Sequence, residues 1–251
     1  LQFLHKELSL RWTASACAAA ASNGHVDCLI YLHKQGCPWD ASTLQSAGTG
    51  GHLACLKYAH SHGCTPNDLI VISGAVEHGH LECVKYMVTH GLYTSDGVYD
   101  ICAEAAASSS TAILAYLLAN HIGSVDEVCN SAATCGSLPC LQFAFSQGCS
   151  LDRSAYLAAQ AGHLDCLVFA LAHQETLSAY ALGQICNIAV HRGFVECLKA
   201  AHTAGCPVSK YTMLLAVRHD RLACVEYLHS QDCPWDADVT AMAALHGRLA
   251  C

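Results

Sequence analysis

A Gly-His step recurs along this chain at a nearly constant interval, and this recurrence limits the folds open to the chain. We call the first residue of each full or weakened copy an anchor. The nine anchors are Gly24, Gly51, Gly79, Ser109, Gly136, Gly162, Gly193, Asp220 and Gly247. Consecutive anchors lie 26 to 31 residues apart. Such a period is typical of a solenoid, in which short units stack along one axis, and not of a domain built around one core.

Each repeat predicts two helices separated by a turn at the anchor. In the second repeat we expect the first helix over Ser42–Thr49. The second helix follows the anchor, with apolar residues at offsets two, four, five, seven and eight, a wide apolar stripe at helical spacing. The anchor Gly suits a left-handed helix end. The predicted fold class is therefore all-α, a solenoid of stacked helix–turn–helix repeats.

Small residues precede every anchor. An alanine stands four residues before it in all nine repeats, and the next residue is Ala, Gly or Val. This pattern predicts that neighbouring helices approach closely there. The expected N-caps of the first helices, which have side-chain oxygens, are Ser15, Asp40 or Ser42, Asp68, Asp100, Asp126, Asp152 and Asp236.

Most of the eighteen cysteines occupy three registers of the repeat, namely four and thirteen residues after the anchor and seven before it. Other repeats carry aliphatic residues there, such as Leu92 and Met213. A cysteine that interchanges with aliphatic residues acts as a small buried hydrophobe. Cys135 alone falls outside the registers, and we expect it to be exposed. No signal peptide is recognisable, so disulfides are not the default, and we predict a reducing, cytoplasmic location.

Charge and hydropathy exclude several partners. The chain is 53% hydrophobic and 13% charged, with a formal net charge of -8 and no Lys/Arg block. Nucleic-acid binding depends on neutralising phosphates, so we expect no DNA or RNA partner. No apolar run reaches the roughly 18 residues of a membrane span. We expect a monomer without a membrane contact.

Seventeen histidines together with the cysteines raise the possibility of a metal site or a nucleophile. The closest pairs, such as His33 with Cys37, recur at repeat registers near the end of the second helix, where an imidazole can contact the last carbonyls. The histidines after the anchors should bond backbone at the turn; they are His25, His52, His80 and His163. We therefore predict no metal, no cofactor and no catalytic residue, and keep a metal-binding or redox protein as an alternative.

The register AA-x-x-G-H-[LV]-[DE]-C-L-x-Y-L-x-x-x-G-C resembles the ankyrin repeat. Its paired small residues, inter-helix Gly-His, acidic position and second-helix stop fall at the family's offsets. The matching residues are Ala47-Gly48, Ala158-Ala159, Gly24-His25, Gly51-His52, Gly79-His80, Gly162-His163, Asp27, Glu82, Asp165, Glu196, Gly36, Gly63, Gly91, Gly148 and Gly205. The resemblance implies an ankyrin-like α-solenoid over residues 1–251, with about eight full repeats and terminal half-repeats.

Two departures from the family matter. The period averages about 27 residues, shorter than the family's, and the missing residues fall between units, so we expect a short or absent β-hairpin finger. The short units rich in Gly-His-Leu-Glu-Cys and Cys-Pro-Trp-Asp are similar to ankyrin arrays of protists and large DNA viruses. Because the chain begins and ends in mid-repeat, we expect it to be part of a longer array.

The resemblance implies a non-catalytic scaffold that binds a partner protein on the concave face, which the first helices line, and on the loops. Specificity then resides at variable positions outside the stacking registers. The candidate partner-binding residues are Asp40, Gln45, Thr49, Asn67, Asp68, Glu77, His78, Asp152, Tyr156, Gln160, His191, Arg192, Tyr211, Arg218, His219 and Asp236. The alternative is a structural spacer within a larger protein. Trp39 and Trp235, in the loops, either cover the core edge or serve as exposed interface anchors.

Overall fold

The structure is a computed structural model that describes residues 12–65, 72–92, 101–173 and 177–248. These residues form α-helices joined by turns, and no strand occurs within the described ranges. The chain divides into two compact units, Leu1–Gly123 and Ser124–Cys251, which we call unit 1 and unit 2. The predicted all-α class of helix–turn–helix repeats is confirmed for the described residues.

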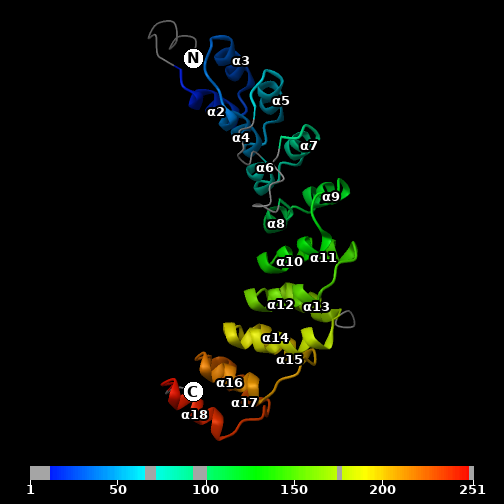
Figure 1. Cartoon of the computed structure of the whole chain (residues 1–251), viewed down its shortest axis with the longest axis vertical. Coiled ribbons are helices and arrows are strands. Elements are labelled where there is room, and N and C mark those ends of the chain that lie inside the picture. Colours follow the sequence, from blue (N-terminus) through cyan, green and yellow to red (C-terminus); the bar gives the residue numbers. More distant parts are fainter. Residues whose placement is uncertain (1–11, 66–71, 93–100, 174–176, 249–251) are drawn as a thin grey trace. The chain divides into compact units, whose positions relative to one another are not determined.

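Unit 1 contains four described helix pairs (Figure 1). The first helices of its repeats are α2 (Ala14–Ser22), α4 (Ala41–Thr49), α6 (Ser73–Glu77) and α8 (Ile101–Ala107). The second helices are α3 (Val26–Lys34), α5 (Leu53–Ser61), α7 (Leu81–Thr89) and α9 (Thr111–Ala119). Each helix contacts its own partner and the corresponding helix of the next repeat, so the unit has two helical layers.

Unit 2 repeats this arrangement, and in Figure 1 its first helices lie one after another beside its second helices. The first helices are α10 (Val125–Cys135), α12 (Asp152–Ala161), α14 (Ala179–Arg192), α16 (Lys210–Arg218) and α18 (Ala237–Leu245). The second helices are α11 (Leu138–Ser146), α13 (Leu164–Ala172), α15 (Val195–Thr203) and α17 (Leu222–Ser230).

One backbone hydrogen bond defines the turn in every repeat. The amide of the residue after the anchor donates to the carbonyl of the alanine that stands four residues before the anchor. At the anchor Gly51, for example, His52 donates to Ala47 at 2.8 Å. All nine anchors have positive φ, including the two that are not glycine, Ser109 and Asp220. The predicted left-handed helix end is therefore confirmed, and its bond closes the turn as in a Schellman motif.

Anchor glycines also leave room for a side chain of the next repeat. A Cβ at Gly51 would lie 2.5 Å from Nδ1 of His80, and one at Gly24 would meet His52 at the same distance. The residue after the anchor thus packs across the preceding turn. Our prediction that these histidines bond backbone holds for His163, whose Nε2 lies 2.9 Å from the carbonyl of Thr134.

The alanines before the anchors lie where neighbouring first helices meet. Eight of the nine are buried, and Ala243 is half-buried. At this register only a small side chain fits between adjacent helices, as the sequence pattern predicted. Leucines five residues after the anchors, such as Leu56 and Leu167, are fully buried and form the core between the two layers.

The predicted N-caps are only partly correct. Asp40 accepts from the amide of Ser42, and Asp236 accepts from that of Asp238, as expected. Helix α2 instead begins after Thr13, and α10 begins after Ser124. Asp126 and Asp152 accept hydrogen bonds from the next repeat, from the amides of Ser150 and Ser178 respectively. Asp68 and Asp100 lie outside the described residues.

The hydrogen-bond partners of the histidines nine residues after the anchor differ from our prediction. Nδ1 of His33 lies 2.9 Å from the hydroxyl of Tyr58 in the next repeat, and His60 repeats this contact with Tyr86. His202 does so with Tyr227 in unit 2. These imidazoles therefore bond a tyrosine of the next second helix and not the last carbonyls of their own. Burial raises the pKa of the three tyrosines.

Among the described residues, the cysteines at the predicted registers are buried, apart from the half-buried Cys28, and Cys135 is exposed. One pair departs from our expectation of free thiols, because Cys129 and Cys149 form a disulfide. They stand seven residues before and thirteen after one anchor. The same two registers bring Cys186 within 3.8 Å of the carbonyl of Cys206. The repeat itself therefore places these cysteine pairs together.

Candidate functional site

The sixteen predicted partner-binding residues fall on or beside the first helices, apart from Asn67 and Asp68, which lie outside the described residues. In unit 1, Gln45 and Glu77 are exposed on α4 and α6. The other three have local structural contacts. Asp40 caps α4, Nδ1 of His78 lies 2.9 Å from the carbonyl of Gly74, and Thr49 is half-buried against Gly74.

Unit 2 brings several of these residues together. A groove of about 390 Å³ lies between the N-terminal halves of α12 and α14. Its lining residues are Asp152, Arg153, Tyr156, Ser178, Tyr180, Ala181 and Gln184. The carboxylate of Asp152 accepts a 2.6 Å hydrogen bond from the amide of Ser178, which ties the two repeats at the end of the groove. Aromatic, amide and charged groups therefore converge on one open surface.

Sequence reasoning predicted Asp152 and Tyr156 but missed the other five lining residues, of which Arg153, Tyr180 and Gln184 have the large side chains. Arg153 and Gln184 stand nine residues before their anchors, the register that also holds the predicted Tyr211. Including every residue at this register among the candidates would have found both Arg153 and Gln184. Tyr180 stands thirteen residues before Gly193, and only the 14-residue length of α14 brings it to the surface, where 78% of it is exposed.

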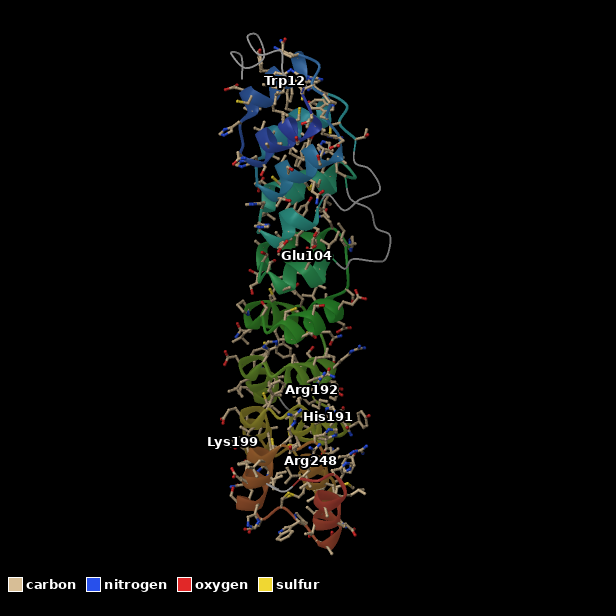
Figure 2. The ribbon with its side chains drawn as sticks, turned by 90° about the vertical axis from the view of Figure 1, so that its left-hand side faces the viewer. Trp12, Glu104, His191, Arg192, Lys199 and Arg248 are labelled. Atoms are coloured by element: carbon tan, nitrogen blue, oxygen red, sulfur yellow. A yellow bond between two sulfur atoms is a disulfide. The ribbon has the colours of Figure 1, made fainter. Side chains whose placement is uncertain are left out.

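A second group of predicted residues gathers at the C-terminal ends of α14 and α16. The rings of His191 and His219 lie 4.3 Å apart, edge to face, and Arg192 and Arg218 are exposed beside them. Burial lowers the pKa of His219, and the nearby His191 and arginines lower it further. Figure 2 shows His191, Arg192 and Arg248 along one side of unit 2, with Lys199 toward the other.

Of the remaining predicted residues, Tyr211 and Asp236 lie at the N-terminal ends of α16 and α18, whereas Gln160 lies at the C-terminal end of α12. Tyr211 is 60% exposed on α16. Asp236 pairs with Lys210, which also pairs with Asp238, so these charges join α16 to the start of α18. Lys210 lowers the pKa of Asp236. Gln160 is half-buried near the end of α12. Asp236 thus stabilises the stack, whereas Tyr211 remains available.

The tryptophans of the loops have different environments. Trp39 is half-buried, with its ring stacked on His33 at 4.0 Å, so it covers the edge of its repeat. Trp235 is 58% exposed and lines an apolar groove of about 790 Å³ between α16, α17 and α18. In the preceding repeats, the second helix of the next repeat packs at this position. We therefore assign that groove to the stacking surface.

The described residues offer little for other chemistries. They contain no group of three or more His, Cys, Asp or Glu side chains arranged to hold a metal ion. Burial raises the pKa of the thiols of Cys64, Cys83 and Cys166 to about 11, which keeps them protonated and weakly nucleophilic. Within the described ranges, none of the helices has the length and apolar character needed to cross a membrane.

Comparison with known proteins finds likeness only among solved structures. No family model matches the chain, and no curated protein matches it either. Among solved structures, the crystal structure of the human ASB11 ankyrin repeat domain is similar to this chain, with 19% sequence identity. The alignment covers 76% of this chain and 84% of that one, with a TM-score of 0.40.

Proposed function

We propose that this chain is a non-catalytic scaffold that binds a partner protein through the first helices and loops of unit 2. The observation that carries the proposal is the groove between α12 and α14. Tyr156, Tyr180 and Gln184 line this groove, and all of its lining residues belong to α12, α14 or the N-cap of α14, with none from a second helix. Tyrosines with an exposed surface and few rotatable bonds are effective interface anchors.

Several sequence features support the proposal. The ankyrin-like register continues from unit 1 into unit 2, so we propose one repeat array over residues 1–251 that belongs to the ankyrin class. The many free buried thiols favour an intracellular protein. The competing hypothesis, a structural spacer, has no use for exposed tyrosines at variable positions.

The test is a capture experiment with the whole chain as bait. A Tyr156→Ala/Tyr180→Ala variant removes the aromatic walls of the groove, and the matched control Val168→Ala changes an exposed apolar residue on α13 of the same repeat. We expect the groove variant to capture at least about tenfold less of the proteins that the wild type and the control capture. Truncating a hot-spot aromatic costs roughly 2 kcal/mol or more of binding free energy. If the groove variant captures as much partner protein as the control variant, the groove is not part of the binding surface.

A further inference from the structure

Basic residues concentrate in three successive turns at the end of unit 2. Helices α14 and α16 carry His191, Arg192 and Arg218 in their last turns. The other described first helices, in both units, have no basic residue there. A cation near a helix C-terminus favours the helix dipole, but seven helices of the same repeat form without one. Helix stability therefore does not account for this cluster.

Two of the arginines in these turns have structural roles. Nε and Nη2 of Arg221 each donate to the carbonyl of His191 at 3.3 Å, and the side chain packs against Gly193. Arg248 pairs with Asp220 at 3.4 Å. Both hold the turns in place, so the cluster has a rigid base.

The other two arginines remain open to solvent. Arg192 and Arg218 are exposed, and neither forms an ion pair with the described residues. Counting four arginines and Asp220 with neutral histidines, the three turns carry a formal charge of +3 in a chain of -8. Such a local excess attracts and orients acidic groups.

We propose that Arg192 and Arg218 bind an acidic segment of the partner protein, an inference that rests on the proposed scaffold function. The two arginines belong to neighbouring first helices, whose axes are about 10 Å apart. A polyproline II helix rises about 3.1 Å per residue with three residues per turn, so carboxylates three residues apart lie on one side of it and match this spacing. Each guanidinium can hold one carboxylate with two parallel hydrogen bonds. The segment therefore has the pattern Glu-x-x-Glu in a polyproline II conformation. Nucleic acid is disfavoured, because its many phosphates need more cations than two.

The experiment measures fluorescence anisotropy of a labelled peptide with repeated Glu-Gly-Gly-Glu, added to the whole chain at low salt. A peptide with Gln in place of Glu is the neutral probe. The test variant is Arg192→Gln/Arg218→Gln, and Lys57→Gln/Lys199→Gln removes the same charge from exposed positions on second helices. We expect the test variant to bind the acidic peptide at least about tenfold more weakly, and the control to stay within about twofold of wild type.

Each other outcome contradicts the inference. Equal weakening by both variants means that net charge alone attracts the peptide. Tighter binding of a phosphopeptide or a single-stranded oligonucleotide than of the acidic peptide means that the site selects phosphate. If the wild type ignores the acidic peptide while the groove variant still loses captured proteins, this inference is wrong and the scaffold function stands. Circular dichroism melting of each variant shows that the fold is intact.

Discussion

The two units solve the same packing problem at the inter-helix turn with different side chains. In unit 1, His52 and His80 lie over the preceding anchors, and the turns carry no arginine. In unit 2 the same position is taken first by His163, as in unit 1, and then by Phe194 and Arg221. Imidazole, phenyl and guanidinium groups are all flat. Over Gly79 the group is the small hydroxyl of Ser110. The comparison teaches that this position accepts groups of different size and charge, so its charge is free to serve another purpose.

A second contrast concerns the layer of second helices. In unit 1, His33 and Tyr58 are joined by a hydrogen bond between adjacent repeats. In unit 2 the polar contact is kept between His202 and Tyr227, but another pair of repeats carries Phe145 and Phe169 at the same two registers, with their rings edge to face at 5.7 Å. A polar pair and an aromatic pair thus fill equivalent space.

The largest expected effect concerns the disulfide of unit 2. Cys129→Ala should lower the free energy of unfolding by about 3 kcal/mol, because the bond to Cys149 closes a loop of 20 residues. Cys17→Ala, the equivalent change in unit 1, should cost only about 1 kcal/mol from lost packing. Urea unfolding with and without reductant measures both. A loss for Cys129→Ala that reductant does not diminish would contradict the bonded state.

The next effect tests the packing over the anchors. Gly51→Ala should cost about 2 kcal/mol, because it strains a left-handed backbone and pushes the His80 ring aside. Gly63 has the same backbone handedness but nothing within 4 Å of an added Cβ. Gly63→Ala should therefore cost about half as much, from the backbone alone. Equal urea midpoints for the two variants would show that His80 does not need this space.

A smaller effect comes from the contacts between second helices. Tyr58→Phe removes the hydroxyl that bonds His33 and should cost about 1 kcal/mol. Phe169→Tyr, the reciprocal change, places a hydroxyl against Phe145, which offers no partner, and should cost a similar amount. Thermal melting of the pair checks both. If either change stabilises the chain, the two registers are not equivalent.

The smallest effect is a pH dependence in unit 1. Burial, and then the neighbouring His62, lower the pKa of His33. Below the ordinary histidine pKa of about 6.5 the unfolded chain therefore binds more protons, and stability falls as the pH is lowered. His33→Phe with Tyr58→Phe should reduce this fall. Urea midpoints at several pH values measure this loss of stability. If the double variant keeps the pH profile of the wild type, groups other than His33 cause the pH dependence.

Much of the fold was predictable from the sequence because the residues that make each packing contact recur in all nine repeats. Ala47 and its counterparts predicted close helix packing, and the anchor glycines predicted left-handed turns. The contact of His33 was not predictable, because its partner Tyr58 is 25 residues away in the next repeat. The hydrogen bonds that Asp126 and Asp152 accept were not predictable for the same reason, because their donors also lie in the next repeat.

The candidate site was less predictable than the fold. Register identified Tyr156 and Arg218 as variable, but it also offered Asp40 and Asp236 as binding residues, although both form the helix caps that the sequence itself predicted. Tyr180 escaped because it stands thirteen residues before its anchor, in the extra first turn of the 14-residue α14 that begins after the Ser178 cap. Variable positions therefore indicate where binding is allowed, and only the structure separates free side chains from occupied ones.

Hydrogen–deuterium exchange on the complex with a captured partner tests the central claim most directly. Our account predicts slower exchange in α12, α14, α16 and the loops before them, with the exposed ends of α13 and α15 unchanged. Protection confined to the second helices, or the same exchange pattern with and without partner, would contradict it.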